Sequence, residues 1–214
     1  LGMIHVQPSE FAKIACAIVL AGWFARQEPR TREFIGGFVI PGWIVCVLTV
    51  LIGAEVDLGS AAIVASVGGG IMFAAGTRLR YLVPLVMSGA LALVGAVKLM
   101  PNRMERIMAF LNLEKYKDGL GLQQWRALIA FGSGGPRGVG LGEGRQKQGF
   151  LPESHTDFIF PTIGEELGLI GTLLVVVLFV ALVIAGLWIA HRAQDRFGKL
   201  LAFGIVTMFG LEAL

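Results

Sequence analysis

Charged side chains are scarce in this sequence. Asp, Glu, Lys and Arg make up 15% of its 214 residues, whereas ordinary soluble domains carry about 25%. More than half of the residues, 55%, are hydrophobic, and the mean hydropathy is +0.74. The net charge of +3 comes with no basic run suited to nucleic acid. The composition therefore indicates a polytopic membrane protein without a nucleic-acid partner.

Cysteine is rarer still. Cys16 and Cys46 are the only two, and both lie in apolar segments without metal-ligand spacing, so we expect two small core residues and no metal site. The sequence also lacks an initiator Met and a basic stretch before its first apolar run, and it stops inside an apolar segment at Leu214. We therefore expect an internal piece of a larger protein, with no signal peptide to set aside.

Long apolar runs dominate the rest of the sequence. Each complete run is close to the roughly 20 residues that a helix needs to cross a bilayer, and the runs are continuous rather than alternating, which argues against strands. The sequence therefore predicts an all-α, polytopic transmembrane helix bundle, as one domain over residues 1–214 with an extracytoplasmic loop at 101–157. The six predicted segments are about Pro8–Ala25, Gly36–Ala54, Leu58–Gly76, Tyr81–Met100, Leu167–Ala190 and one that begins near Leu200.

Basic residues mark one side of the membrane. Three short loops carry them, and because these loops alternate along the chain, all three fall on one side, which the positive-inside rule makes cytoplasmic. The basic residues are Arg26, Arg30 and Arg32, then Arg78 and Arg80, then Arg192, Arg196 and Lys199. The segment Pro101–Thr156 is then outside although it holds eight Lys or Arg, since long loops follow the rule poorly. This topology brings Glu10, Lys13, Asp57 and Asp157 to the outer face.

The outer segment is predicted to be partly helical. Asn102–Leu113 has apolar residues at helical spacing, and Gln123–Phe131 is a second helical candidate. Seven glycines then occur within thirteen residues, from Gly132 to Gly144. This run either forms a flexible linker, which composition favours, or lets the backbone approach a ligand closely. It does not match a nucleotide-binding loop, because it follows no strand and lacks the Gly-Lys-Ser/Thr ending.

Ionisable residues are dense from Arg145 to Gly171. Charge near a bilayer is costly, so such residues are functional candidates by default. Asp157 stands just before an apolar run, where it could cap a helix or act as a general base, and the residues alone favour neither role. His155 and Asp157 have a spacing that suits zinc poorly. Glu165 and Glu166 are neighbours about 100° apart on a helix, so at most one is expected to face the protein.

Two other places carry charge beside apolar runs. Glu10 and Lys13 are three residues apart on one helical face, and Pro8 suits the first turn of that helix. We expect them to form an ion pair, structural or functional, and we expect neutralising Glu10 alone to be worse than replacing both. Asp57 precedes the third segment, and its simplest role is the N-cap of that helix.

Several of these motifs resemble one family. The stretch Gly140–Gly171, GLGEGRQKQGFLPESHTDFIFPTIGEELGLIG, is similar without a gap to the signature loop of the FtsW/RodA/SpoVE (SEDS) peptidoglycan glycosyltransferases. PSEFAK at Pro8–Lys13 matches the family motif Pro-Ser-Glu-x-Ala-Lys. AEVDLGS keeps Asp57, Leu58 and Gly59 of the family's Gln-Pro-Asp-Leu-Gly-Thr, and the changed residues weaken a catalytic role for Asp57. The resemblance spans essentially all residues, covers about six of ten transmembrane helices and is closer to the FtsW than to the RodA branch.

The resemblance implies an enzyme that polymerises lipid II, the undecaprenyl-pyrophosphate-linked disaccharide peptide, into glycan strands during septal wall synthesis. Asp157 would be the base for the acceptor hydroxyl, and Glu10 and Lys13 would belong to the catalytic group. The implied substrate-binding residues are Asp57, Arg145, Lys147, His155, Thr156 and Glu165. No resident metal or cofactor is implied, although a divalent cation, Mg²⁺ or Mn²⁺, could accompany the pyrophosphate.

Partners and location follow from the same resemblance. It implies a class B penicillin-binding protein, other divisome membrane proteins and membrane lipid as partners. The implied location is the bacterial cytoplasmic (inner) membrane at the division septum, with the active site on the extracytoplasmic face. A lipid II flippase is one alternative, but its pathway would need charges through the membrane depth, and apart from Lys98 they cluster at the outer face. A non-catalytic divisome scaffold is the other, and the intact HTDF motif disfavours it.

Overall fold

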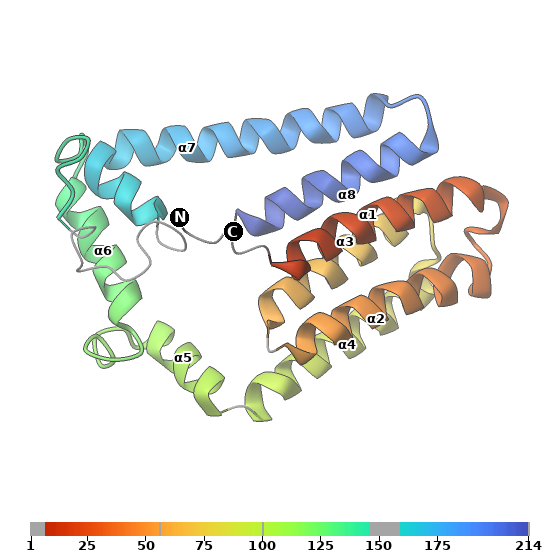
Figure 1. The fold of residues 1–214 in the computed structure, drawn as a ribbon, viewed down its shortest axis with the longest axis horizontal. Coiled ribbons are helices and arrows are strands. Elements are labelled where there is room, and N and C mark those ends of the chain that lie inside the picture. Colours follow the sequence, from red (N-terminus) through yellow and green to blue (C-terminus); the bar gives the residue numbers. More distant parts are fainter. Residues whose placement is uncertain (1–6, 56, 100, 146–158, 214) are drawn as a thin grey trace. The chain divides into compact units, whose positions relative to one another are not determined.

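The computed structural model describes residues 7–55, 57–99, 101–145 and 159–213. These residues form helices joined by turns, and no strand occurs among them, so the all-α prediction is confirmed (Figure 1). The chain divides into two compact units. Unit 1 is Leu1–Leu93 together with Phe179–Leu214, and unit 2 is Val94–Leu178.

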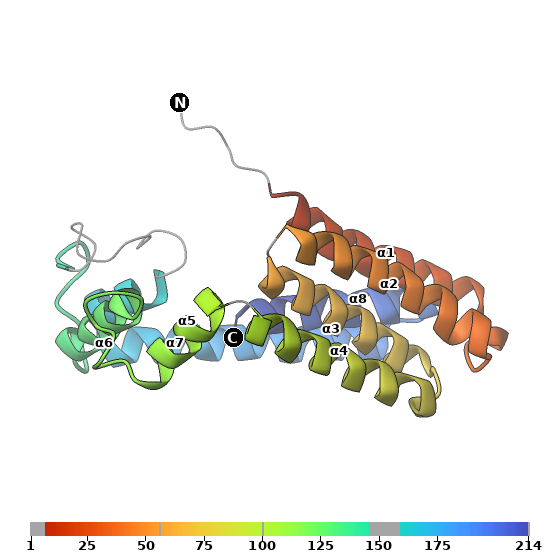
Figure 2. The ribbon, with the colours of Figure 1, turned by 90° about the horizontal axis from the view of Figure 1, so that it is seen from below.

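Unit 1 is a helix bundle with α3 in its middle. Helix α3 packs against α1, α2 and α8, and α1 also packs against α8 (Figures 1 and 2). A π-helical turn, η2, leads directly into α2, and a short 3₁₀ turn, η1, follows α1. Two of the helices, α4 and α7, belong partly to unit 2. The bounds are α1 Pro8–Arg26, η1 Glu28–Arg30, η2 Ile35–Val39, α2 Ile40–Ala54, α3 Leu58–Ala75, α4 Leu79–Leu99, α7 Ile159–Arg192 and α8 Arg196–Glu212.

The core of unit 1 is apolar and closely packed. Its fully buried side chains include Leu20, Phe24, Val64, Val67, Ile71 and Met72. Two glycines allow neighbouring helices to approach. A Cβ on Gly68 would lie 2.4 Å from Cγ2 of Val45, and one on Gly204 would lie 2.6 Å from Cδ1 of Ile71. Small residues at such contacts are typical of helices that pack in lipid.

Four helices are long and apolar enough to cross a membrane: Pro8–Arg26, Ile35–Ala54, Leu58–Ala75 and Ile159–Arg192. Only 17% to 39% of their most apolar windows is buried inside the structure. Their remaining apolar surface would be unfavourable in water and is suited to lipid. The protein is therefore a multi-pass membrane protein, as predicted. The fourth predicted segment overlaps α4, whose stretch Leu79–Gly95 is apolar but shorter than these four.

Most predicted helix boundaries are close to those observed. Helix α3 ends at Ala75, and the residue that caps it, Gly76, adopts the left-handed conformation (φ 94°) that favours glycine. Helix α8 begins at Arg196 rather than Leu200, because Asp195 caps it by accepting a 2.7 Å hydrogen bond from the N–H of Gly198. The predicted start of the fifth segment, Leu167, lies beside a break in α7: the helix as a whole begins at Ile159, and Gly168 within it has non-helical angles.

The basic loops of unit 1 meet at one end of the bundle. Arg196 pairs with Glu28 across 2.7 Å, and its Nη2 donates to Oγ1 of Thr31 at 3.0 Å and to the carbonyl of Ala75 at 2.8 Å. One side chain thus joins the loop after α1, the end of α3 and the start of α8. The alternating topology predicted from the short loops is therefore confirmed within unit 1.

Unit 2 contains α5 (Pro101–Leu111), α6 (Leu122–Gly134), the loop that follows α6 and the first part of α7. Both helices predicted in the outer segment are confirmed, and α6 extends beyond its predicted end at Phe131. The rings of Phe131 and Phe160 pack edge to face with centroids 5.6 Å apart, so α6 lies against the first turn of α7.

The two cysteines differ in their surroundings. Cys16 is buried in the core of unit 1, whereas Cys46 is exposed on α2. The prediction of a core residue is confirmed for Cys16 and wrong for Cys46, because the apolar surface of a membrane helix is not all turned toward the protein.

Candidate functional site

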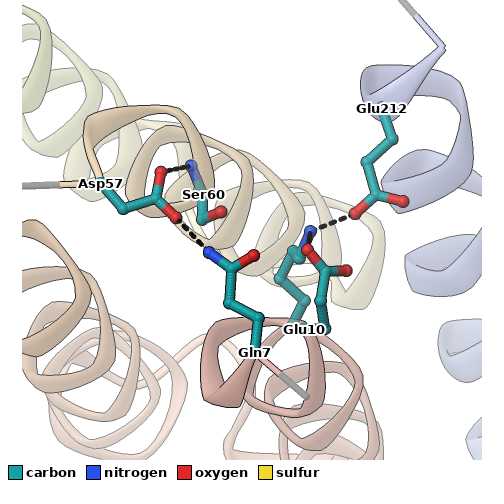
Figure 3. Close-up of polar contacts among 6 residues, drawn as sticks. Gln7, Glu10, Asp57, Ser60 and Glu212 are labelled. Carbon is teal, nitrogen blue, oxygen red and sulfur yellow. Dashed lines mark hydrogen bonds and ion pairs between the residues drawn. The ribbon is translucent and has the colours of Figure 1, made fainter. Parts of the chain in front are cut away.

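A buried lysine lies near the start of α1. The side chain of Lys13 is 3% exposed, and its Nζ donates to Oε1 of Glu10 at 2.8 Å, so the predicted ion pair is confirmed. The same Nζ also pairs with a carboxylate oxygen of Glu212 at the end of α8. Figure 3 shows the carboxylates of Glu10 and Glu212 turned toward this amine. We call Glu10, Lys13 and Glu212 the Lys13 cluster.

The Lys13 cluster changes what substitution of Glu10 is expected to do. The Glu10 side chain is 54% exposed and that of Glu212 is 28% exposed, so the second carboxylate is the better shielded of the two. The prediction that neutralising Glu10 alone leaves an unpaired buried charge is corrected, because Glu212 still faces Lys13. The amine is buried, and its two partners come from two different helices.

Asp57 joins the starts of α1 and α3. Its Oδ1 accepts a 3.0 Å hydrogen bond from the N–H of Ser60, which confirms the predicted N-cap of α3. Its Oδ2 accepts a 3.1 Å hydrogen bond from Nε2 of Gln7, the residue that precedes α1 (Figure 3). Asp57 and the Lys13 cluster therefore lie at the same end of unit 1, opposite Arg196.

Two other predicted site residues, Arg145 and Glu165, lie in unit 2 beside a break in α7. Gly168 has φ 68° and ψ −165°, which are not helical angles. In an unbroken helix, the carbonyls of Glu165 and Glu166 would accept hydrogen bonds from the N–H groups of Leu169 and Ile170. The break leaves these two carbonyls and two N–H groups in need of other partners.

The loop that follows α6 supplies those partners. We call residues 135–145 the glycine loop. The N–H groups of Leu169 and Ile170 donate to the carbonyls of Gly135 (2.9 Å) and Pro136 (3.3 Å). In return, the carbonyls of Glu165 and Glu166 accept from the N–H groups of Val139 (2.9 Å) and Gly140 (3.1 Å). The glycine loop is thus inserted into an opened turn of α7.

Both glutamate side chains also bind the glycine loop. Oε1 of Glu165 accepts from the N–H of Arg145 at 3.0 Å and from the hydroxyl of Ser133 at 3.4 Å. Oε2 of Glu166 accepts from the N–H of Gly142 at 3.0 Å. Glu165 is 2% exposed, and Glu166 is half-buried. The prediction that only one of them faces the protein is wrong, because the inserted loop covers more of α7 than a neighbouring helix would.

Glycine is required where the end of α6 and the glycine loop touch α7. A Cβ on Gly138 would lie 2.1 Å from the carbonyl oxygen of Glu166, and one on Gly134 would lie 2.0 Å from that of Gly164. Gly138 also has φ 79°, in the left-handed region. The interpretation of this run as a flexible linker is therefore wrong: its glycines permit close backbone approach, and the partner is α7.

The predicted site residues fall into three sets. Glu10, Lys13 and Asp57 lie together in unit 1, and Arg145 and Glu165 are hydrogen-bonded to each other in unit 2. The remaining four, Lys147, His155, Thr156 and Asp157, lie outside the described residues. Glu212 was missed by the sequence analysis. The sequence did contain a signal for Glu212, because it is a carboxylate in an apolar segment that ends on the same side as Glu10.

The structure does not group ligands for a resident metal in the part that it describes. No cluster of three or more His, Cys, Asp or Glu suited to a metal ion occurs among those residues. The carboxylates of Glu165 and Glu166 bind backbone N–H groups, as carboxylates in a structural role do.

Comparison with known proteins gives one consistent result. The family described as "Cell cycle protein" (FTSW_RODA_SPOVE) matches residues 1–214. A Geobacter metallireducens protein named "Probable peptidoglycan glycosyltransferase FtsW" is 42% identical over 209 residues, which are 98% of this chain and 56% of that protein. A Legionella pneumophila protein of the same name is 41% identical over 218 residues, covering 100% of this chain and 55% of the relative. The chain thus spans about half the length of these curated relatives.

A solved structure shares the fold. It is described as "Structural coordination of polymerization and crosslinking by a peptidoglycan synthase complex" and superposes with a TM-score of 0.73 at 24% sequence identity. The match covers 100% of this chain and 59% of the other. The all-helical fold expected from the sequence is therefore one that a solved structure already shows.

Proposed function

The chain belongs to the FtsW/RodA/SpoVE family, and from this premise we propose that the full-length protein is a peptidoglycan glycosyltransferase that polymerises lipid II. The observation that carries the proposal is the 42% identity, over 98% of this chain, to a relative named as such an enzyme. The family's charged motifs support it, because Glu10 and Lys13 are paired and Arg145 is held by Glu165.

The proposed reaction transfers a glycan chain between two lipid-linked substrates. Asp157 takes the proton from the acceptor sugar hydroxyl, whose oxygen then attacks the anomeric carbon of the donor. The bond from that carbon to the pyrophosphate oxygen breaks, and undecaprenyl pyrophosphate leaves. A sugar hydroxyl is a poor nucleophile until a base removes its proton, which is why the site needs a carboxylate.

The leaving pyrophosphate gains negative charge as the bond breaks. Lys13, Arg145 and Lys147 are the proposed cationic contacts, with a divalent cation, Mg²⁺ or Mn²⁺, arriving with the substrate. His155, Thr156, Glu165 and Asp57 are assigned to the substrate-binding region by the same family motifs. A contact between Lys13 and the pyrophosphate would compete with existing ion pairs, since the amine already pairs with Glu10 and Glu212.

The proposed setting is the cytoplasmic membrane at the division septum, with the site on the extracytoplasmic face. The basic loops that Arg196 joins support this orientation, because they would be cytoplasmic and would place Glu10, Lys13 and Asp57 at the outer end of unit 1. A class B penicillin-binding protein and other divisome membrane proteins are the proposed partners, and the solved structure of a polymerisation and crosslinking complex supports the first of them.

The test is glycan-strand synthesis from purified lipid II by the full-length protein with its penicillin-binding partner. Asp157→Asn keeps the size and most of the capping ability of Asp but cannot accept the proton. We expect a folded variant whose polymerisation falls by about 10²–10⁴-fold while lipid II binding survives. Near-normal synthesis by the folded variant would eliminate Asp157 as the base. Transport of lipid II without strand synthesis by the wild-type protein would refute the enzyme itself.

A further inference from the structure

Glu165 and Glu166 each hold the glycine loop twice. From this loop, each accepts a hydrogen bond at its main-chain carbonyl, from Val139 and Gly140 respectively, and another at its side-chain carboxylate. The main-chain bonds follow from the break at Gly168 and do not depend on the side chain. The carboxylate bonds do depend on it, and they reach farther along the loop, to Gly142 and Arg145.

We infer that Glu165 and Glu166 are positioning residues, whose carboxylates clasp the glycine loop and set the place of Arg145 for the proposed reaction. The inference deepens the proposed function and rests on it, since that function assigns Arg145 to the pyrophosphate. In this role Glu165 does not bind the substrate directly. It acts on the substrate through the main chain of Arg145.

The burial of Glu165 favours this role. A buried carboxylate is costly unless hydrogen bonds satisfy it, and Glu165, 2% exposed, accepts from Arg145 and Ser133. At this exposure the carboxylate offers a substrate almost no accessible surface. A carboxylate would also repel the negatively charged pyrophosphate, whereas its hydrogen bond to the main-chain N–H of Arg145 fixes the backbone that carries a cationic side chain.

The surrounding glycines also fit a clasp. A Cβ on Gly144 would lie 3.1 Å from Oε2 of Glu165 and 3.0 Å from Oε1 of Glu166. The two carboxylates thus converge on the same loop residue from adjacent positions of α7. Glu143, between Gly142 and Gly144, is exposed and provides a matched control of the same charge in the same loop.

The first measurement is amide hydrogen exchange on the full-length protein in detergent, and it does not depend on activity. Glu165→Ala should speed exchange at Arg145, and Glu166→Ala should speed it at Gly142, each by roughly ten- to hundredfold, the loss expected for a hydrogen bond to a charged acceptor. Glu165→Gln keeps an acceptor oxygen and should retain most of the protection. Glu143→Ala should change neither amide. Unchanged exchange in α1 and α3 verifies that each variant is folded.

The second measurement is lipid II polymerisation. Glu165→Ala should lower kcat by about tenfold or more with little change in KM, because a displaced Arg145 stabilises the leaving group less in the transition state. Glu165→Gln should recover most of kcat, and Glu143→Ala should match the wild type. A raised KM with unchanged exchange at Arg145 would overturn the inference and make Glu165 a substrate ligand. Loss of polymerisation in Glu165→Gln with full protection at Arg145 would also overturn it.

The two measurements separate this inference from the proposed function. If the wild-type protein makes no glycan strands, the proposed function fails, and the exchange data still decide whether the carboxylates hold the loop. If the wild type is active and the alanine variants keep both wild-type exchange and wild-type kcat, only the clasp is refuted.

Discussion

Removing the two carboxylates of the Lys13 cluster, first singly and then together, should reveal which of them neutralises the buried amine. The Lys13 side chain is 3% exposed, so it cannot recover solvation where it stands. Glu10→Gln leaves Glu212 as its partner, and Glu212→Gln leaves Glu10. Only the double substitution leaves the amine without a carboxylate from this cluster.

The exposures set the expected magnitudes. Glu10 is 54% exposed, so its pair with Lys13 is screened and its loss should cost about 0–1 kcal/mol. Glu212 is 28% exposed and comes from another helix, so its loss should cost about 1.5–3 kcal/mol, as for a hydrogen bond between charged groups. The double substitution should cost about 3–5 kcal/mol, because it leaves a buried charge unpaired. Adding Lys13→Met to the double variant removes that charge and should restore most of the stability.

The assay is equilibrium unfolding of the full-length protein in mixed detergent micelles, with Glu33→Gln on the exposed surface of unit 1 as the control. The double variant should lose more stability than the two single variants lose together. The reasoning fails if Glu10→Gln alone costs as much as the double substitution, since Glu212 would then contribute nothing. It also fails if Lys13→Met does not rescue the double variant.

Three further predictions use other parts of the structure. Gly138→Ala should expose the inserted loop to exchange and lower polymerisation at least tenfold, because its Cβ would lie 2.1 Å from the carbonyl oxygen of Glu166 at φ 79°; wild-type exchange in residues 139–142 would contradict this. Asp57→Asn should unfold like the wild type, whereas Asp57→Ala should lose about 0.5–2 kcal/mol through its cap; equal stability of the two variants would refute the cap as a stabilising element. A cysteine at Gly119 should react with an impermeant reagent from outside the cell and one at Gln194 should not, and the reverse pattern would invert the topology.

Local patterns in the sequence determined the helices and their caps. A continuous apolar run specifies a membrane helix by itself, because every backbone group is satisfied within the segment. Asp57 was recognisable as an N-cap because a cap bonds to a residue three positions ahead. The pair of Glu10 and Lys13 was predictable for the same reason, since residues three apart share a helix face. The basic residues of the short loops predicted that these loops lie on one side, and in the structure Arg196 joins them at one end of unit 1.

Only the tertiary structure decided which distant groups meet. Glu212 is 199 residues from Lys13, and no local spacing links a charge in the last helix to one in the first. The inward direction of both Glu165 and Glu166 depends on the glycine loop, which enters a turn of α7 that an uninterrupted helix would have closed. The glycine-rich run was interpreted as flexible because glycine content indicates only the conformational freedom of the unfolded chain. Their fixed positions arise from contacts that the folded chain makes with α7.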